Sequence, residues 1–282
     1  MSRRVVLGAD VPSGLRGEKA LLVQLLERSP ADHPPPGTWE RLSKPGLAGR
    51  ERWRWTRDDE TQLYVKRYTR TPLRQQFDRV LRQDRRGSRA AWEFEVGRRL
   101  ALAGVAAAPV VGYAEEMVGP WERRSVVVLG AVPGEALDRA WPGLVAAGSP
   151  VTRGAGRHRA ARELAAFVAA FHAAGLCHRD LYLCHIFMRI DSPGDKAPGF
   201  TLIDLARVFA PKLRRWRWII KDLGQLDASA QQLGLTRTDR LRFLRAYLGG
   251  RAARAGLRAY VDAIVAKSRA ILARMARKGR AR

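Results

Sequence analysis

Residues 178–187, with the sequence HRDLYLCHIF, place a carboxylate, an arginine and two imidazoles within a few positions of one another. Asp180 could accept a proton from a hydroxyl group, and His185 follows five residues later. A positioned aspartate of this kind is the usual proton acceptor in phosphoryl transfer, a reaction in which the protein mainly orients the reactants and stabilises charge. The segment therefore predicts phosphoryl transfer if the other groups that this reaction needs are present.

A lysine that binds nucleotide phosphates needs a carboxylate to fix its direction, and the chain offers a candidate lysine followed by two glutamates. Lys66 lies in the strand-like segment YVKRY. Glu95 has arginines three and four residues later and is expected to pair with them in solvent. Glu93 lies at the edge of the apolar stripe of the same helical segment, where an unpaired carboxylate would be costly. We therefore assign Glu93 to Lys66.

The segment GFTLIDLARV supplies a candidate metal ligand. Its apolar, strand-like part ends at Asp204, 24 residues after Asp180. Mg²⁺ prefers hard oxygen ligands near nucleotide phosphates, so we predict that Asp204 binds Mg²⁺. Upstream, KPGLAGRER offers Gly46 and Gly49 as backbone contacts for phosphate, with Arg50 beside them. The spacing G-x-G-x-x-G that is typical of a nucleotide-covering loop is missing there.

The segments that position these groups change in character along the chain. EKALLVQLLERS has leucines at helical spacing, and the Pro-rich ADHPPPG follows it. Strand-like segments then predominate: ERWRW alternates Trp53 and Trp55 with arginines, and TQLYVKRY completes a hairpin. One helix, SRAAWEFEVGRRLALAG, interrupts them. We predict an α+β fold with an N-terminal extension (1–37), a small β-rich lobe with one helix (38–129), and a hinge leading to a larger helical lobe (130–282).

The composition limits the class of protein. The chain has 282 residues, of which 46% are hydrophobic, enough for two lobes with real cores. It carries 52 Lys and Arg against 27 Asp and Glu, a net charge of +25 that favours anionic partners. Two cysteines exclude a disulfide scaffold, and no signal-peptide core or bilayer-spanning apolar run is present. We therefore expect a cytoplasmic protein whose charge could bring it to the cytoplasmic face of the inner membrane.

The order Lys66, Glu93, H-R-D and Asp204 resembles the protein-kinase superfamily, whose loop reads H-R-D-L-x-x-x-N. HRDLYLCHIF, together with LIDLARV and RRWRWIIKDLGQL, resembles more closely the bacterial lipopolysaccharide kinase family (Kdo/WaaP type), in which His replaces that Asn, as His185 does here. The resemblance covers residues 40 to 250. It implies a two-lobed, protein-kinase-like fold.

The resemblance also implies roles for individual residues. Lys66 and Glu93 would orient ATP, and Asp180 would be the catalytic base. His185 would lie beside that base, as a metal neighbour or as a hydrogen-bond partner of a catalytic group. Asp204 would chelate Mg²⁺.

The segment between Asp204 and Asp222 is short, at 18 residues, and lacks A-P-E. Protein kinases hold a peptide with a longer segment, so the acceptor is expected to be small or lipid-borne. Asp222 resembles the buried aspartate that ties the catalytic loop in kinases. Trp216 and Trp218 could lie at a membrane interface. Four basic residues could bind a phosphorylated sugar: Lys212, Arg214, Arg215 and Arg217.

The implied function is an ATP-dependent kinase acting on a hydroxyl of a lipopolysaccharide inner-core sugar, heptose or Kdo. Its partners would be the core glycolipid or its saccharide and an anionic membrane surface; no nucleic-acid motif is present. The basic helical segment 251–282 either lies on that membrane or, as we favour, docks its apolar face on the larger lobe. Two alternatives stay open: a phosphotransferase for another small molecule or a protein, and a non-catalytic nucleotide-binding scaffold.

Overall fold

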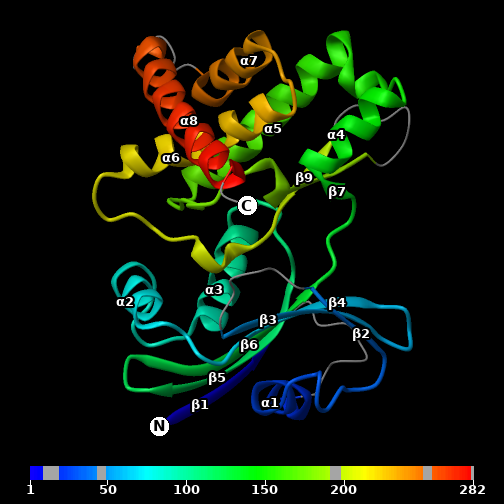
Figure 1. Ribbon diagram of the computed structural model, residues 1–282, viewed down its shortest axis with the longest axis vertical. Coiled ribbons are helices and arrows are strands. Elements are labelled where there is room, and N and C mark those ends of the chain that lie inside the picture. The colour runs from blue at the N-terminus through cyan, green and yellow to red at the C-terminus, as the bar shows by residue number, and fades with distance from the viewer. Residues whose placement is uncertain (9–18, 43–48, 191–197, 250–255, 281–282) are drawn as a thin grey trace. The chain divides into compact units, whose positions relative to one another are not determined.

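The computed structural model describes residues 1–8, 19–42, 49–190, 198–249 and 256–280 (Figure 1). The chain divides into two compact units. Unit 1 comprises Met1–Arg99 with Ala107–Val132, and unit 2 comprises Leu100–Ala106 with Pro133–Arg282. A large sheet dominates unit 1 and helices dominate unit 2, so the predicted α+β class is confirmed.

Unit 1 is built on a six-stranded antiparallel sheet in the order β1-β5-β6-β4-β3-β2. Its strands are β1 (Ser2–Leu7), β2 (Thr38–Arg41), β3 (Arg50–Thr56), β4 (Gln62–Tyr68), β5 (Val110–Val118) and β6 (Trp121–Gly130). Its helices are α1 (Lys19–Glu27), α2 (Leu73–Arg82) and α3 (Arg89–Leu102), the last ending at the boundary with unit 2.

The alternation of side chains in β3 and β4 decides which face of the sheet forms the core. Trp53 and Trp55 lie opposite Val65 and Leu63, and all four are buried. The leucines of α1 pack against them. The predicted hairpin with both tryptophans on one face is confirmed, and this register directs Lys66 to the opposite face.

The N-terminal residues belong to unit 1 and are not a separate extension. β1 pairs with β5 along the edge of the sheet, and α1 buries Leu22, Leu25 and Leu26 in the core. The division between the units falls after Val132, not after residue 129. The expectation of one helix in the β-rich lobe is also wrong, because α2 precedes α3. Leu73, Phe77 and Leu81 of α2 have helical spacing but are exposed, and the sequence analysis did not assign this segment to a helix.

Unit 2 combines five helices with a small three-stranded sheet among its described residues. The helices are α4 (Leu137–Ala146), α5 (Gly154–Ala173), α6 (Arg215–Gln232), α7 (Arg237–Leu248) and α8 (Leu257–Arg280). The strands are β7 (Glu135–Ala136), β8 (Ile186–Arg189) and β9 (Gly199–Leu202), and the short 3₁₀ turns are η2 (Pro150–Thr152), η3 (Leu183–His185) and η4 (Leu205–Arg207).

Helix α8 packs along α6 and buries its apolar stripe there. Ile264 and Ile271 are buried, and Gly224 of α6 permits the approach, since a Cβ at that position would lie 2.7 Å from the Lys267 Cγ. The favoured docking of this basic helix is therefore confirmed for its described side chains. In the part of the chain that the structure describes, no helix is long and apolar enough to cross a membrane.

Candidate active site

The first component is a buried ion pair in unit 1. Lys66 on β4 places its Nζ atom 2.6 Å from Oε1 of Glu93 on α3, and the two side chains are 10% and 1% exposed. Glu95 instead pairs at the surface with Arg98 and Arg99, whose hydrogen bonds and charges hold the pKa of its carboxyl below the usual value. The structure therefore brings Lys66 and Glu93 together as expected. What this pair does for a nucleotide stays a prediction.

The second component is the loop that contains Asp180, whose backbone is held by one face of α6. The buried carboxylate of Asp222 accepts hydrogen bonds from the backbone N–H groups of His178, at 2.6 Å, and Arg179, at 2.8 Å. Arg179 has a positive φ of 70°, a conformation that is unfavourable for an arginine. Two charge-assisted hydrogen bonds stabilise the loop in this conformation, so Asp222 has the structural role that the sequence analysis expects.

Two further residues on the same face of α6 continue this support. Gln225 accepts a hydrogen bond from the backbone N–H of Leu181, and the Ser229 hydroxyl accepts one from Leu183, each at 3.2 Å. They follow Asp222 by three and seven residues, which is the spacing of one helix face. The sequence analysis missed them, although polar residues at helical spacing in an apolar segment were an available signal.

Asp180 lies in the middle of this loop with its carboxylate accessible. Its side chain is 27% exposed, and Oδ2 accepts a hydrogen bond from Nη1 of Arg207 at 2.6 Å. The Asp180 backbone carbonyl accepts hydrogen bonds from the Tyr182 N–H and from Nδ1 of His185. Arg207 belongs to LIDLARV but was not predicted to act here. The rigid backbone around Asp180 leaves its carboxylate able to reach a ligand.

His185 has a defined tautomer because its partner can only accept. Nδ1 lies 2.7 Å from the Asp180 carbonyl oxygen and must carry the proton, so Nε2 is the nitrogen with a lone pair in the neutral ring. Burial lowers the pKa of His185, but Cys184, the Asp180 carbonyl and the Asp204 carboxylate together raise it above the usual value. The ring stacks on His178, whose pKa is lowered by burial and by His185. His185 is therefore a hydrogen-bond partner of the loop, and a metal-ligand role for Nε2 stays a prediction.

Asp204 follows β9 and precedes η4, in a left-handed conformation with φ 58° and ψ 57°. Asp tolerates this region better than most residues, and such strain is common at functional sites. Its half-buried carboxylate offers the hard oxygen that Mg²⁺ prefers, and Mg²⁺ sites beside phosphates need only one or two protein carboxylates. The donor type and position fit the predicted metal ligand.

A different cluster fits a metal ion poorly. Among the described residues, His172, Cys177 and Asp222 are the one group of three His, Cys, Asp or Glu side chains close enough to share an ion. The Asp222 oxygens already accept backbone N–H groups, and burial together with the Asp222 charge raises the pKa of the Cys177 thiol to about 12. His172 contacts Tyr247 and Asp222. The cluster is therefore structural.

Lys221 is a further residue that the sequence analysis did not assign. Its ammonium donates a hydrogen bond to the Arg179 carbonyl from the helix that carries Asp222. Burial lowers the pKa of Lys221 to about 8, although Asp180 and Asp222 oppose the shift. The Lys221 ammonium group, which loses its proton near pH 8, therefore lies against the backbone of the loop at Arg179.

The predicted glycine contacts have different outcomes. Gly46 lies outside the described residues. Gly49 has a φ of 71°, and a Cβ there would lie 2.2 Å from the Arg70 carbonyl oxygen. Its own carbonyl accepts a hydrogen bond from Thr69. Backbone packing thus explains the glycine at position 49, and a contact with phosphate stays a prediction.

The four predicted substrate-binding residues are all exposed at the start of α6 or just before it: Lys212, Arg214, Arg215 and Arg217. Arg215 donates a hydrogen bond to the His172 carbonyl, and Arg217 lies over the ring of Trp218. Trp216 packs edge-on against Tyr260 of α8. Packing therefore accounts for part of this segment, and its binding of a sugar stays a prediction.

Comparisons with known proteins agree with this geometry. The model of the Lipopolysaccharide kinase (Kdo/WaaP) family matches residues 46–247. The lipopolysaccharide core heptose(I) kinase WaaP of Pseudomonas aeruginosa is 38% identical over 168 residues, 57% of this chain and 59% of that protein. WaaP of Escherichia coli K12 is 38% identical over 90 residues, 31% of this chain and 33% of that protein. The match thus spans less than two thirds of either relative.

A solved structure extends the likeness in space. The structure of WaaP in complex with acyl carrier protein is similar with a TM-score of 0.66 and 27% identity, over 94% of this chain and 98% of that one. This likeness confirms the predicted kinase-like fold. The family match includes the Lys66–Glu93 pair, the Asp180 loop, Asp204 and the supporting face of α6. This chain belongs to the lipopolysaccharide kinase (Kdo/WaaP) family.

Proposed function

We propose that the protein transfers the γ-phosphoryl group of ATP to a hydroxyl of a lipopolysaccharide inner-core sugar, heptose or Kdo. The curated relatives are named core heptose(I) kinases, which favours heptose. The observation that carries the proposal is the Asp180 loop. Four backbone N–H groups of residues 178–183 are bound by α6, while the Asp180 carboxylate stays accessible.

Each residue then has a distinct task. Asp180 would accept the proton of the attacking hydroxyl, and its neighbour Arg207 would keep that carboxylate oriented. His185 would keep the Asp180 peptide in place through Nδ1. Lys66, directed by Glu93, would bind the nucleotide phosphates, and Asp204 would hold Mg²⁺, which when bound neutralises charge on the phosphates.

Transfer of label tests the proposal directly. Purified protein, γ-labelled ATP, Mg²⁺ and dephosphorylated core saccharide should give labelled saccharide, and Asp180→Ala should abolish the product. Glu95→Gln is the matched control, since it removes a surface carboxylate engaged only with Arg98 and Arg99 in its described ion pairs. No transfer by the wild type, or equal transfer by Asp180→Ala, would contradict a kinase of this acceptor. ATP binding without Mg²⁺-dependent turnover would instead support the non-catalytic scaffold.

An acyl carrier protein is a further proposed partner, because unit 2 contains a cavity suited to an acyl chain. The cavity has a volume of about 860 Å³ and lies among helices α5 to α8. Its lining includes Leu164, Leu226, Leu244, Val261 and Ile264. Asp180, His185 and Asp204 do not line it. A similar structure contains WaaP with acyl carrier protein. The net charge of +25 of this chain would favour a carrier of opposite charge.

A binding assay with acylated and non-acylated carrier protein distinguishes use of the cavity from simple charge attraction. The protein should bind the acylated carrier at least about tenfold more tightly, since the acyl chain would bury apolar surface in the cavity. Equal affinity for the two forms would contradict the cavity as the acyl site.

We also propose a cytoplasmic location, with reversible contact of the protein with the inner membrane.

A further inference from the structure

Helix α2 exposes its apolar face and buries its polar face, which is the reverse of an ordinary surface helix. Leu73, Phe77 and Leu81 follow one another at intervals of four residues, and their side chains are 70%, 54% and 80% exposed. The polar residues Gln76 and Arg79 lie on the opposite face and are buried. A surface helix normally packs its apolar stripe against the core, so this orientation needs a cause.

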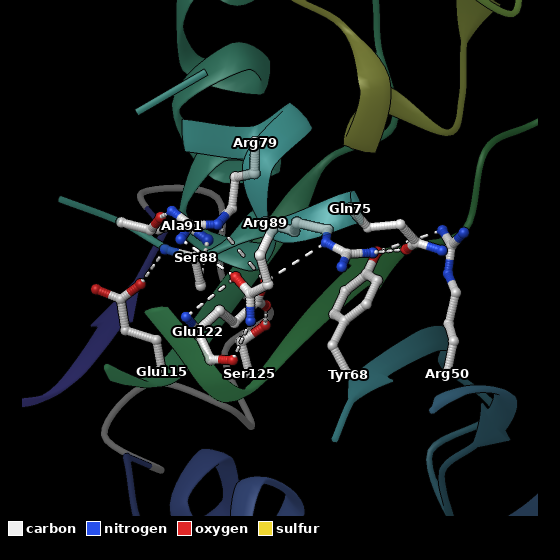
Figure 2. A network of polar contacts seen from close by, with 12 residues as sticks. Arg50, Tyr68, Gln75, Arg79, Ser88, Arg89, Ala91, Glu115, Glu122 and Ser125 are labelled. Carbon is white, nitrogen blue, oxygen red and sulfur yellow. Dashed lines mark hydrogen bonds and ion pairs between the residues drawn. The ribbon is translucent and has the colours of Figure 1, made fainter. Parts of the chain in front are cut away.

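A buried polar network provides that cause (Figure 2). The Arg79 guanidinium donates hydrogen bonds to the carbonyl groups of Asp84, Gly87 and Pro120. The fully buried carboxylate of Glu122 on β6 balances its charge at 3.9 Å and that of Arg89 at 3.4 Å. These partners fix Arg79 in its buried position, because removing one partner of a buried charge is strongly destabilising.

Gln76 ties α2 to β6 through a second pair of contacts. Its side-chain amide donates to the Glu122 carbonyl at 2.6 Å and accepts from the Glu122 N–H at 3.2 Å. The polar face of α2 is therefore bound to the sheet at two successive turns. Rotation of α2 to bury its leucines would break the contacts of both Gln76 and Arg79. These contacts therefore hold the apolar face of α2 toward the surface.

The turn between β5 and β6 extends this apolar face. Trp121 is 37% exposed, and its ring meets that of Phe77 edge-on with centroids 5.3 Å apart. Val118, 48% exposed, lies opposite Trp121 across the strand pair. We call these five side chains the α2 patch: Leu73, Phe77, Leu81, Val118 and Trp121. Apolar patches of this kind on a protein surface usually mark an interaction site.

Arginines border the α2 patch. Residues 73–86 contain five arginines and two aspartates. Arg74, Arg85 and Arg86 are exposed, whereas Asp78 pairs with Arg82, and Arg123 beyond the β5–β6 turn is exposed but pairs with Glu116. An exposed apolar helix face with a tryptophan and a basic border is the pattern of a segment that lies in the interface of an anionic bilayer.

We infer that the α2 patch docks on the surface of a membrane that contains anionic phospholipids. Leucine, phenylalanine and tryptophan side chains would enter the boundary between headgroups and acyl chains, and the arginines would contact phosphate. An anionic bilayer fits this face because an exposed tryptophan and exposed apolar helix positions lie next to exposed arginines. The inference deepens the proposed contact with the inner membrane, on which it rests, by assigning a surface to that contact, and it depends on none of the residues proposed for phosphoryl transfer.

Vesicle sedimentation with the full-length protein tests this inference. We expect the wild type to bind vesicles of phosphatidylcholine and phosphatidylglycerol more tightly than phosphatidylcholine alone, with an affinity that falls as salt rises. The triple variant Leu73→Gln, Phe77→Gln, Leu81→Gln should bind at least about tenfold more weakly. Glutamine keeps the helix propensity, and the residues it replaces are exposed, so thermal unfolding should be unchanged. The matched control, Leu102→Gln with Val145→Gln, replaces exposed apolar residues elsewhere and should bind like the wild type.

Several outcomes would overturn the inference. Equal binding by wild type and triple variant would do so, and so would absence of wild-type binding to anionic vesicles. Failure of the wild type to bind vesicles, combined with self-association that the triple variant loses, would assign the α2 patch to a protein interface. Phosphorylation of a soluble, deacylated core saccharide should be equal in wild type and triple variant. That assay reports on the kinase proposal alone, so failure of either proposal is recognised separately.

Discussion

Asp180 and Asp222 are two aspartates of the same site with different surroundings: Asp180 belongs to the loop of residues 178–187, and Asp222 on α6 binds the backbone of that loop. Asp222 is fully buried, and its two oxygens accept consecutive backbone N–H groups at 2.6 and 2.8 Å. Asp180 is 27% exposed, and its carboxylate contacts the guanidinium of Arg207, a side chain that is 51% exposed. A carboxylate enclosed by backbone donors stabilises a conformation, whereas one that faces solvent can take a proton from a ligand. The same chemical group is thus structural or chemical according to its partners.

Substitution of Asp180, the partly exposed aspartate, should give the largest effect. Asp180→Asn should lower phosphoryl transfer by about 10³-fold, because the amide cannot accept the hydroxyl proton. The free energy of unfolding should change by less than about 0.5 kcal/mol, since the backbone contacts of the loop do not use this side chain. Single-turnover assays and chemical denaturation measure the two quantities. If Asp180→Asn lost stability along with activity, Asp180 would have a structural role like that of Asp222, which would contradict the prediction.

The buried aspartate should show the converse behaviour. Asp222→Asn should lower the free energy of unfolding by about 3 kcal/mol, because it removes a charge that stabilises two buried N–H groups. Chemical denaturation measures this loss. Asp262→Asn, at an exposed position of α8, is the control and should be nearly neutral. Unchanged stability of Asp222→Asn would show that α6 supports the loop mainly through other contacts.

His185 bonds to the Asp180 peptide, and its effect should be intermediate. His185→Ala should lower turnover by about tenfold to a hundredfold, as is usual when a supporting hydrogen bond beside a reactive group is removed. Mg²⁺ affinity should fall much less, because imidazole is a poor ligand for this ion. Turnover at saturating Mg²⁺ and a Mg²⁺ titration separate the two quantities. A large loss of affinity with normal saturated turnover would instead make His185 a metal ligand.

Lys221 should produce the smallest effect, visible as pH dependence. Its pKa of about 8 lies below the usual 10.5, so above pH 8 the folded protein loses a cation next to the Arg179 carbonyl. Turnover should therefore decrease modestly above pH 8, and Lys221→Arg should move the decrease to higher pH. Between pH 8 and 10.5 the unfolded chain binds more protons at this residue, so its own contribution to stability should rise with pH. A pH–rate profile identical in Lys221→Arg would exclude this residue as the cause.

The Asp180 loop itself was the most predictable part of the site, whereas two of its supports on α6, Gln225 and Ser229, were missed. Asp180 and His185 are separated by few residues, so their proximity is nearly a property of the local chain. Glu93 could be distinguished from Glu95 because helical spacing assigns the two to different faces. Arg207 and Lys221 were missed, since an arginine or lysine in a basic chain carries no signal until its partner is known. Whether Asp204 and His185 share a metal ion stays a prediction.

The amino-acid sequence by itself determined which residues are available for chemistry and the α+β class, because these follow from residue types and short-range spacing, whereas the role of Asp222 was expected only from the resemblance to kinases. Only the tertiary structure decided that residues 2–7 and 19–27 belong to the sheet unit and that α2 faces outward. Periodicity alone predicts that Leu73, Phe77 and Leu81 turn inward. Arg79 reverses this orientation. Its partners are residues 84, 87, 120 and 122, which lie beyond the end of α2. They can stabilise the buried arginine only once the chain has folded.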